Sequence, residues 1–366
     1  MKIVLTGGGT GGHIIPLIAV ARKIKEKEIS AEFMFLGPKE NFSKKFMTAE
    51  GITIKHAMSG KMRRYFSILN FVDALKIPIG IVQALWHLLW FMPEVIFSKG
   101  GCATLPVVIA GWLYHIPILI HESDANPGMA NSVLAKLASR VAVSYPSAES
   151  YFHSEQVVVT GSPLREDINK GNKENAQKMF SLLESKKTIF IWGGSQGAKA
   201  INDKILEVLP ELLPNYQIIH QTGEKNFEEV KKRAGELGIK IGRDGYHILS
   251  FVGEELKDIL AVTDLVISRA GSSSISEIAA NGKPAIIIPI ENSANDHQRM
   301  NAYSIAKIGG CVVLEESNLG EHMLLGKINE IMNNEELRNK LTQNIKSFYH
   351  PDAADRIAEG ILGMTK

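Results

Sequence analysis

The chain has 366 residues, more than one hydrophobic core usually supports, so two domains are expected. Apolar residues make up 45% and charged residues 22%, a composition typical of a globular enzyme. The two cysteines, Cys102 and Cys311, form no C-x-x-C pattern, which argues against a disulfide or zinc framework. No signal peptide is expected, because the chain opens with a core strand and a glycine turn, and the cytosol is the default compartment.

The charge is uneven along the chain, although the formal net charge is only +2. Residues 1–163 hold 16 Lys and Arg against 11 Asp and Glu, a net of +5, whereas the remainder holds 25 against 28, a net of −3. A basic N-terminal half favours an anionic partner there, such as a membrane surface or a phosphorylated substrate.

Short apolar strands alternate with helical segments from end to end. The expected strands are 2–6, 32–36, 52–55, 94–97, 117–121, 140–143, 157–159, 187–192, 216–220, 246–250, 265–267, 285–288 and 311–314. Most are continuous apolar runs, which is typical of parallel strands covered by helices on both faces. We therefore predict an α/β fold of two doubly wound domains, joined through a polar linker near 167–175, with the ligand in the cleft between them.

Residues 7–13, Gly-Gly-Gly-Thr-Gly-Gly-His, connect the first strand to an apolar-periodic helix. Glycines let the backbone approach a ligand closely, and the N–H groups at a helix start favour an anion. Gly7, Gly9 and Gly12 match the G-x-G-x-x-G dinucleotide pattern. The second strand, however, ends in Gly37-Pro38 without the carboxylate that would hold a ribose, so NAD binding is disfavoured.

His13 stands at the positive end of this helix, which favours the neutral imidazole. A neutral histidine facing a cleft suits removal of a proton from a sugar hydroxyl. The alternative is a histidine that only supports the loop, and spacing alone does not separate the two.

The stretch from Tyr65 to Met92 is unusually apolar and follows Lys61, Arg63 and Arg64. Its second half is interrupted by polar residues, Pro and Gly, and falls short of the ~20 apolar residues that a spanning helix needs. It is either a buried helix pair in the domain core or a surface that lies on a membrane, with the basic residues at anionic head groups.

Two polar segments follow later strands of the first half. Residues 98–104, Ser-Lys-Gly-Gly-Cys-Ala-Thr, predict on their own only a turn between a strand and a helix. His121, Glu122 and Asp124 stand at the end of a strand, where α/β enzymes keep polar active-site groups.

The second half repeats the strand–glycine–helix pattern at 187–199, where Gly-Gly-Ser-Gln-Gly follows a strand. Neither glycine loop continues into G-K-[ST], so a Walker A motif is excluded. The chain also contains no D-x-D pair for a divalent metal, so we expect the leaving group to be stabilised by a helix dipole and by Arg269.

Residues 268–277 open a helix with a glycine and three serines, Ser272, Ser273 and Ser274. The functional hypothesis places a pyrophosphate at this helix N-terminus and the Glu277 carboxylate on ribose hydroxyls. The structural alternative is that Ser274-x-x-Glu277 forms a capping box. Further on, Asn-Asp-His-Gln at 295–298 offers amide contacts to a sugar.

Together these segments resemble the MurG family of bacterial N-acetylglucosaminyltransferases. The matching segments are G-G-G-T-G-G-H at 7–13, S-K-G-G at 98–101, H-E-S-D at 121–124, G-S-P-L-R at 161–165, G-G-S-Q-G at 193–197, S-R-A-G-S-S-S-I-S-E at 268–277 and D-H-Q at 296–298. They occur in order across nearly the whole chain, and the combination is specific although each piece alone is not.

The resemblance implies a GT-B fold of two Rossmann-like domains facing a central cleft. Residues 1–163 would bind lipid I, undecaprenyl-pyrophosphoryl-muramyl-pentapeptide, and face the membrane. Residues 164–344 would bind UDP-N-acetylglucosamine, and 345–366 would carry a helix, near 345–362, back to the first domain. The implied reaction is inverting transfer of N-acetylglucosamine to the muramyl 4-hydroxyl, giving lipid II in peptidoglycan synthesis.

The resemblance also implies the site residues. His13 is the first candidate for the catalytic base and Glu122 the second. Donor contacts would come from Arg165, Ser195, Val252, Ser272, Ser273, Ser274, Glu277 and Gln298, with Thr10, Gly11 and Gly12 lining the cleft from the other side. No metal and no cofactor are expected.

The implied partners are UDP-N-acetylglucosamine, lipid I and an anionic membrane surface. The protein would be peripheral, on the cytoplasmic face of the cell membrane. Contacts with other cell-wall synthesis proteins are also implied, and none with nucleic acid.

The chain departs from the family pattern at two places. Ser123-Asp124 stands where the family commonly has Gln-Asn, and His297-Gln298 where it often has two glutamines. Two alternatives remain: another GT-B enzyme, such as a UDP-N-acetylglucosamine epimerase or a glycolipid glycosyltransferase, and a membrane scaffold that binds nucleotide sugar without turnover. The basic, apolar segment 61–92 argues against an epimerase, and His13 with Glu122 argues against a scaffold.

Overall fold

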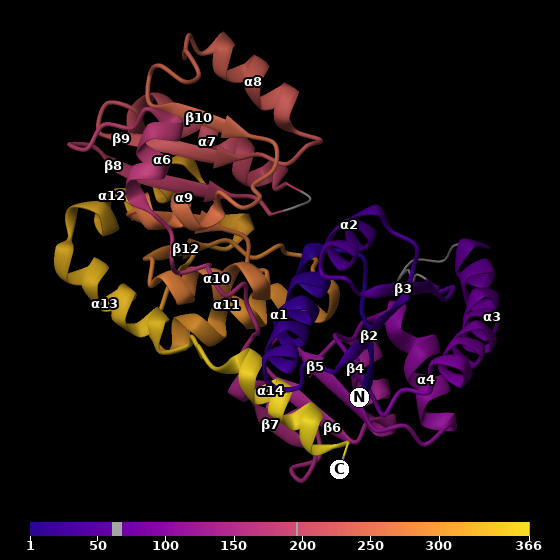
Figure 1. Cartoon of the computed structure of the whole chain (residues 1–366). Helices are drawn as coiled ribbons and strands as arrows, with labels where there is room; N and C mark the ends of the chain where they lie inside the picture. The colour runs from indigo at the N-terminus through magenta and orange to yellow at the C-terminus, as the bar shows by residue number, and fades with distance from the viewer. Residues whose placement is uncertain (61–67, 195–196, 366) are drawn as a thin grey trace. The chain divides into compact units, whose positions relative to one another are not determined.

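The computed structural model describes residues 1–60, 68–194 and 197–365, and the chain forms two compact units (Figure 1). The first unit contains Met1–Arg165 and His350–Lys366, and the second contains Glu166–Tyr349. The first boundary thus lies after Arg165 rather than after residue 163, and the return to the first unit begins at His350 rather than at 345.

The first unit is built on a parallel sheet with the order β3-β2-β1-β4-β5-β6-β7. Its strands are β1 (Lys2–Thr6), β2 (Glu32–Gly37), β3 (Thr53–His56), β4 (Val95–Ser98), β5 (Ile118–Glu122), β6 (Arg140–Val143) and β7 (Val157–Val159). Its helices are α1 (Gly11–Lys27), α2 (Asn41–Ala49), α3 (Ile68–Phe91), α4 (Leu105–Leu113), α5 (Met129–Leu134) and α14 (Ala353–Gly363). Because the strand order reverses beside β1, the loops after β1 and β4 meet at the place where doubly wound sheets bind ligands.

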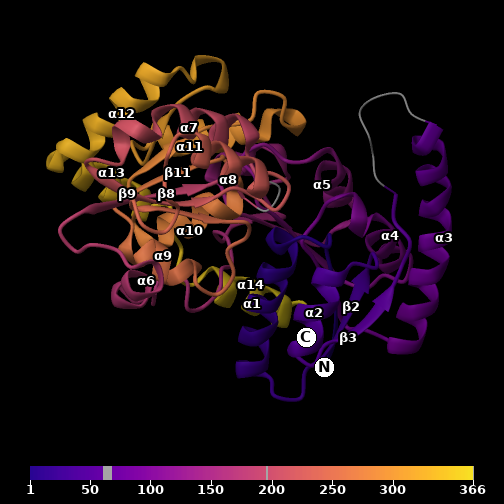
Figure 2. The same ribbon diagram turned by 90° about the horizontal axis from the view of Figure 1, so that it is seen from above.

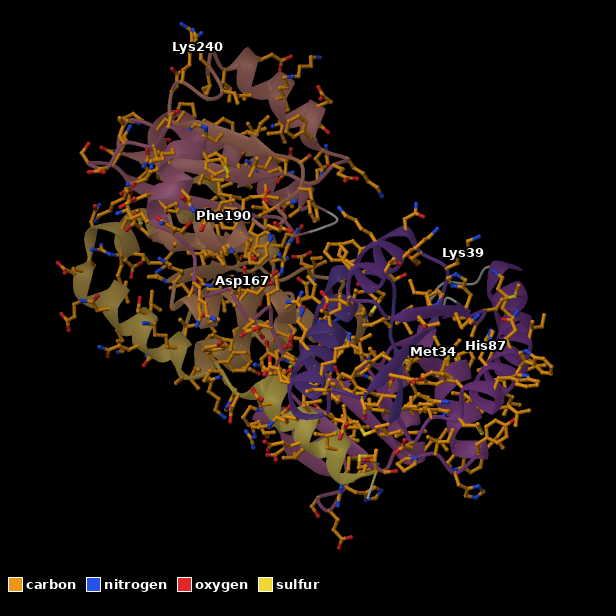
Figure 3. All side chains as sticks on the ribbon, in the orientation of Figure 1. Met34, Lys39, His87, Asp167, Phe190 and Lys240 are labelled. Atoms are coloured by element: carbon orange, nitrogen blue, oxygen red, sulfur yellow. The ribbon has the colours of Figure 1, made fainter. Side chains whose placement is uncertain are left out.

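The central strands of this sheet are buried on both faces, which explains why they are continuously apolar, whereas the edge strands β3 and β7 are more exposed. Ile3 and Leu5 of β1 point into a core shared with α1 and α14, whereas Val4 between them points into a second core with α3 and α4. Met34, labelled in Figure 3, belongs to the second of these cores. The period-2 alternation of a strand thus sends neighbouring residues to opposite helical layers.

The C-terminal helix α14 packs against α1, beside which it lies in Figure 1. Ile357 and Ile361 enter the α1 core, and Lys27 of α1 forms an ion pair with Glu359 at 2.7 Å. The helix begins at Ala353, and a separate helix, α13 (Glu335–Lys346), precedes it, so the single helix expected near 345–362 is wrong in its bounds.

The apolar segment forms one long helix, α3, which packs against α4 (Figure 2). Of the two alternatives for 65–92, the buried helix pair is wrong in that one helix forms, although Ala84 and Leu88 of this helix do enter the core. The membrane-facing alternative stays a prediction. Pro78 is accommodated inside the helix. Lys61, Arg63, Arg64 and residues 65–67 lie outside the described residues.

The second unit is built on a parallel sheet with the order β10-β9-β8-β11-β12-β13. Its strands are β8 (Lys187–Trp192), β9 (Tyr216–Gln221), β10 (Tyr246–Leu249), β11 (Leu265–Ser268), β12 (Ala285–Ile287) and β13 (Val312–Val313). Its helices are α6 (Lys173–Phe180), α7 (Lys199–Leu212), α8 (Phe227–Glu236), α9 (Leu256–Val262), α10 (Ser272–Asn281), α11 (His297–Lys307), α12 (Glu321–Asn333) and α13. Every strand expected from the sequence is present, and the order again reverses beside the first strand of the sheet, here β8. The α/β fold of two doubly wound domains is thereby confirmed.

The main core of this unit joins the sheet to α7, α8 and α12. Ile189 and Ile191 of β8 face these helices. Phe190, labelled in Figure 3, alternates with them and is fully buried. The loops that follow the strands therefore start from a rigid base.

Candidate active site

The ring of His13 is enclosed by two glycine turns of the first unit. A Cβ placed on Gly8 would lie 3.2 Å from His13 Cδ2, and one placed on Gly101 would lie 3.5 Å from His13 Cε1. Gly101 also has a φ of +85°, which L side chains rarely adopt. The turns after β1 and β4 thus require glycine in order to admit the imidazole.

His13 is held in its neutral form. Burial first, and then the nearby charge of Lys99, lower the pKa of His13 from 6.5 to about 4. Among the residues described, its Nδ1 atom is buried and has no hydrogen-bond partner. Near pH 7 the imidazole is therefore uncharged and can accept a proton.

Lys99 is a site residue that sequence reasoning treated only as part of a turn. It follows β4, its residue exposure is 3%, and burial lowers the pKa of its ammonium to about 8 against the opposing charges of Glu122 and Asp124. A lysine inside a glycine-rich turn at the carboxyl end of a strand was the available signal. It supplies the positive charge nearest to His13 and Glu122.

Glu122, the last residue of β5, is 3% exposed, and both its carboxylate oxygens accept hydrogen bonds. The Asp124 backbone N–H donates to Oε1 at 2.9 Å, while the Gly128 N–H and the Asn131 side-chain amide donate to Oε2 at 3.2 and 2.8 Å. Burial raises the pKa of Glu122, with the Asp124 charge as the second cause. Asn131 has no place in the sequence prediction, and no motif signalled it.

His121 serves a different part of the unit from its neighbour Glu122. Its Nε2 lies 3.1 Å from the carbonyl oxygen of Gly161 and 3.3 Å from Ser144 Oγ. Since a carbonyl only accepts, Nε2 carries the proton in this contact. Burial keeps the pKa of His121 far below its usual value, so the ring is neutral. Its contact with Gly161 anchors the segment that leads to Arg165, where the first part of this unit ends.

In the second unit the loop after β8 contains two glycines with positive φ, Gly194 at +75° and Gly197 at +74°. A Cβ on Gly197 would lie 2.5 Å from the Thr222 carbonyl oxygen, so the loop passes directly over the end of β9. Ser195, expected to bind the donor, lies outside the described residues. Val252, in the loop after β10, is 7% exposed.

The helix α10 begins at Ser272, and its N-cap residue is Gly271. Ser274 is therefore inside the first turn, and Glu277 lies deeper in the helix, so the predicted capping box is wrong. Glu277 is buried, as are Ser272 and Ser276, whereas Ser273 and Ser274 are partly exposed. A capping box therefore does not explain Glu277.

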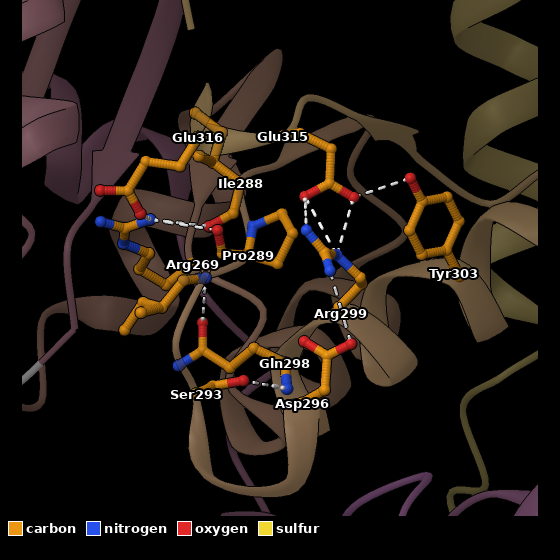
Figure 4. A network of polar contacts seen from close by, with 11 residues as sticks. Arg269, Ile288, Pro289, Ser293, Asp296, Gln298, Arg299, Tyr303, Glu315 and Glu316 are labelled. Atoms are coloured by element: carbon orange, nitrogen blue, oxygen red, sulfur yellow. Dashed lines mark hydrogen bonds and ion pairs between the residues drawn. The ribbon is translucent and has the colours of Figure 1, made fainter. Parts of the chain in front are cut away.

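A polar network links the loops after β11, β12 and β13 (Figure 4). Arg269 donates to Glu316 Oε2 at 2.7 Å and to the carbonyl oxygens of Ile288 and Pro289 at 3.3 and 3.4 Å. Gln298 Oε1 accepts from the Ile290 N–H at 3.2 Å. The last of these bonds ties Gln298, at the start of α11, to the loop after β12.

A second branch of the network holds the start of α11. Arg299 pairs with Glu315 at 3.0 Å, and the Tyr303 hydroxyl donates to the same carboxylate at 2.7 Å. Asp296, just before the helix, has a φ of +54° and lies 3.6 Å from Arg299. Arg299, the residue after Gln298, thus ties the start of α11 to Glu315 in the segment after β13.

Each unit gathers its predicted residues at the carboxyl ends of its strands. In the first unit these are Thr10, Gly11, Gly12, His13 and Glu122, joined by Lys99 and Asn131. In the second they are Val252, the α10 serines, Glu277 and Gln298. Arg165 belongs to the first unit, not to the donor domain expected from the sequence. That a ligand lies between the units stays a prediction.

In the described part of the chain, no group of three or more His, Cys, Asp or Glu side chains could hold a metal ion. No helix in residues 1–60, 68–194 and 197–365 is long and apolar enough to span a membrane.

Two family models match the chain, the glycosyltransferase family 28 N-terminal domain over residues 3–143 and its C-terminal domain over residues 188–357. The chain is 39% identical over 336 residues to the UDP-N-acetylglucosamine–N-acetylmuramyl-(pentapeptide) pyrophosphoryl-undecaprenol N-acetylglucosamine transferase of Clostridium perfringens, covering 92% of this chain and 91% of the relative. It is 37% identical over 361 residues to a protein of the same name, numbered 2, from Bacillus cereus, covering 98% and 99%.

Solved structures share the fold. MurG of Acinetobacter baumannii superposes with a TM-score of 0.76 at 23% identity, covering 99% of both chains. The UDP-N-acetylglucosamine 2-epimerase of Neisseria meningitidis superposes with a TM-score of 0.73 at 13% identity, covering 99% of this chain and 100% of the other. At these identities the two structures show the fold alone and carry no information about the reaction.

Proposed function

The chain belongs to the MurG family of glycosyltransferases, and on this premise we propose that it transfers N-acetylglucosamine from UDP-N-acetylglucosamine to lipid I. The observation that carries the proposal is identity of 39% over 92% of the chain to a transferase named for this reaction. The chain is a UDP-N-acetylglucosamine glycosyltransferase of the GT-B fold, and its product is lipid II.

We assign donor binding to the second unit. The N-terminus of α10, with the partly exposed Ser273 and Ser274, presents backbone N–H groups that suit the UDP pyrophosphate. Glu277 is assigned to the ribose hydroxyls and Gln298 to the sugar, with Ser195, Val252 and Arg165 as further contacts. Support comes from the position of the described residues at the carboxyl ends of β10, β11 and β12.

We assign acceptor activation to His13 in the first unit. The step is one displacement: the muramyl 4-hydroxyl loses its proton to Nε2 of His13 as its oxygen bonds to the anomeric carbon, and the bond to UDP breaks with its electron pair leaving on UDP. The configuration inverts. Burial keeps the imidazole of His13 unprotonated near pH 7, which a base requires, although a pKa of about 4 makes it a weaker base than a free histidine. Glu122 is the weaker candidate, because both its oxygens already accept hydrogen bonds.

We propose that the exposed face of α3 binds an anionic membrane surface and places the enzyme at the cytoplasmic side, where the lipid acceptor would be reached. Trp86 and Trp90 are 60% and 67% exposed, and their rings form an edge-to-face pair with centroids 5.6 Å apart. Val82 and Leu89 are also exposed on this helix, and Trp112 lies on the neighbouring α4. Amphipathic tryptophans at an apolar face suit the interfacial region of a bilayer.

The deciding experiment measures transfer of radiolabelled N-acetylglucosamine from UDP-N-acetylglucosamine to a lipid I analogue. Formation of a labelled lipid product dependent on the acceptor is expected. Donor binding without transfer would indicate the scaffold alternative. Conversion of the donor to another sugar nucleotide without acceptor would indicate an epimerase.

A further inference from the structure

We propose that Asn131 and Glu122 are positioning residues that hold the Gly100–Gly101 turn against the imidazole of His13. The expected effect on transfer rests on the proposed function. The arrangement itself is contained within the first unit.

The two side chains form a continuous hydrogen-bonded link from β5 to the turn after β4. Asn131 Oδ1 accepts from the Gly101 N–H at 2.9 Å, and Asn131 Nδ2 donates to Glu122 Oε2 at 2.8 Å. Only one orientation of the amide satisfies both contacts, because an N–H donates and a carboxylate accepts. Asn131 is 6% exposed, so water does not readily replace either bond.

The amide of Asn131 also lies directly on the turn backbone. A Cβ on Gly100 would lie 2.2 Å from Asn131 Oδ1, and Gly100 has a φ of +78°. On the other side of the turn, Gly101 lies against His13 Cε1. The turn is thus packed between the amide and the imidazole, so a displaced amide changes the surface on which the His13 ring rests.

Glu122 is the fixed end of this link. Its Oε1 is held by the Asp124 N–H and its Oε2 by the Gly128 N–H as well as by Asn131. Such a carboxylate is suited to orienting Asn131 rather than to taking a proton from substrate. The roles therefore divide: His13 meets the acceptor, while Glu122 and Asn131 keep its surroundings in place.

The test uses three variants of the full chain: N131D, E122Q and the double variant E122Q/N131D. N131D places a second buried carboxylate against Glu122, and the two repel one another. The turn against His13 should then move, and kcat should fall by about 10- to 100-fold, as is typical of a misplaced catalytic group. E122Q should lower kcat by about tenfold, because Gln cannot accept at both oxygen positions. In the double variant the introduced glutamine amide can donate to the introduced aspartate, which still accepts from the Gly101 N–H, so kcat should recover above that of N131D.

Two further readouts separate positioning from simple loss of structure. The KM for UDP-N-acetylglucosamine should stay within about twofold of the parent value, while the NMR resonance of the His13 Cε1–H group should shift in N131D and return toward its parent position in the double variant. V133A, which shortens an exposed side chain of α5 near Asn131, is the matched control and should leave the KM and the His13 resonance unchanged.

Should N131D fail to fold, N131A with the same NMR readout takes its place. A folded variant with parent kcat and an unmoved His13 resonance overturns the proposal. Because the resonance is measured without substrate, it tests the link even if the parent protein shows no transfer, which would be a failure of the proposed function alone.

Discussion

Arg269 donates a hydrogen bond to Glu316 at 2.7 Å, and only 11% of its side chain is exposed. The positive charge that the sequence suggested for stabilising the leaving group is therefore already paired inside the second unit (Figure 4). The pair ties the end of β11 to the segment after β13, while the same guanidinium holds the carbonyl oxygens after β12. Arg269 thus ties the loops after β11, β12 and β13 together.

Removal of Arg269 should destabilise the second unit. In R269A, Glu316 and two carbonyl oxygens lose their donor, so the free energy of unfolding should fall by about 3 kcal/mol. E316Q keeps a hydrogen bond from the guanidinium to a neutral amide oxygen and should cost less than R269A, about 2 kcal/mol. Trp192 is the one tryptophan of residues 166–349, so fluorine NMR of fluorotryptophan-labelled protein during urea unfolding reports this unit separately. Equal stability of R269A and the parent would show that the pair contributes nothing.

Replacement of His13 should remove catalysis without removing donor binding. H13A should lower kcat by about 10² or more if the imidazole is the base, since general-base catalysis supplies this much. H153A changes an exposed histidine of the same unit and serves as the control. The check is steady-state transfer together with calorimetric binding of UDP-N-acetylglucosamine. A near-normal kcat for H13A would assign the ring a structural role.

Loss of the exposed tryptophans should release the protein from membranes. W86S/W90S removes two large apolar groups from the α3 face, so binding to vesicles of anionic phospholipid should weaken by at least about tenfold. Y151S, which changes another exposed aromatic residue of the first unit, is the matched control. Co-sedimentation gives the binding and circular dichroism the folding. Unchanged sedimentation of a folded double variant would contradict a membrane contact on this face.

His220 should make the second unit sensitive to acid. Its Nε2 lies 2.9 Å from Asn202 Oδ1 and its Nδ1 2.8 Å from the Tyr246 hydroxyl. Asn202 Nδ2 donates to the Thr222 carbonyl, so Nε2 of His220 carries the proton and Nδ1 accepts from tyrosine. Burial lowers the pKa of His220 from 6.5 to about 3. Protonation would turn Nδ1 into a donor, so it could no longer accept the hydrogen bond from the Tyr246 hydroxyl.

The unfolded chain binds a proton at His220 between these two pKa values and the folded chain does not, so stability is present above pH 6.5 and is lost as the pH falls toward 3. Between pH 7 and pH 5 this histidine alone should cost about 2 kcal/mol. H220Q retains a donor and an acceptor but does not titrate. Between pH 7 and pH 5 its free energy of unfolding should therefore fall by about 2 kcal/mol less than that of the parent. The measurement is the free energy of unfolding against pH for the parent and H220Q, followed through Trp192. Parallel curves for the two proteins would contradict this role of His220.

The order of apolar strands and glycine turns was sufficient to predict both Rossmann-like units, because the central strands are buried and the turns after β1, β4 and β8 contain glycines. It also located His13, whose place after a glycine turn at a helix start is a local property of the chain. Local pattern left two alternatives for Ser274 and Glu277, and the capping box among them is wrong, since such a box depends on where the helix begins and α10 begins at Ser272.

The remaining features depend on residues far apart in the sequence. The link from Glu122 through Asn131 to Gly101 joins two different strand ends, and no spacing rule relates them. The same holds for Arg269 and Glu316, and for the burial that lowers the pKa values of His13 and Lys99. The sequence by itself determined the architecture and the segments that carry chemistry. Only the packed tertiary structure decided which of their side chains meet, because hydrogen bonding and desolvation act between neighbours in space.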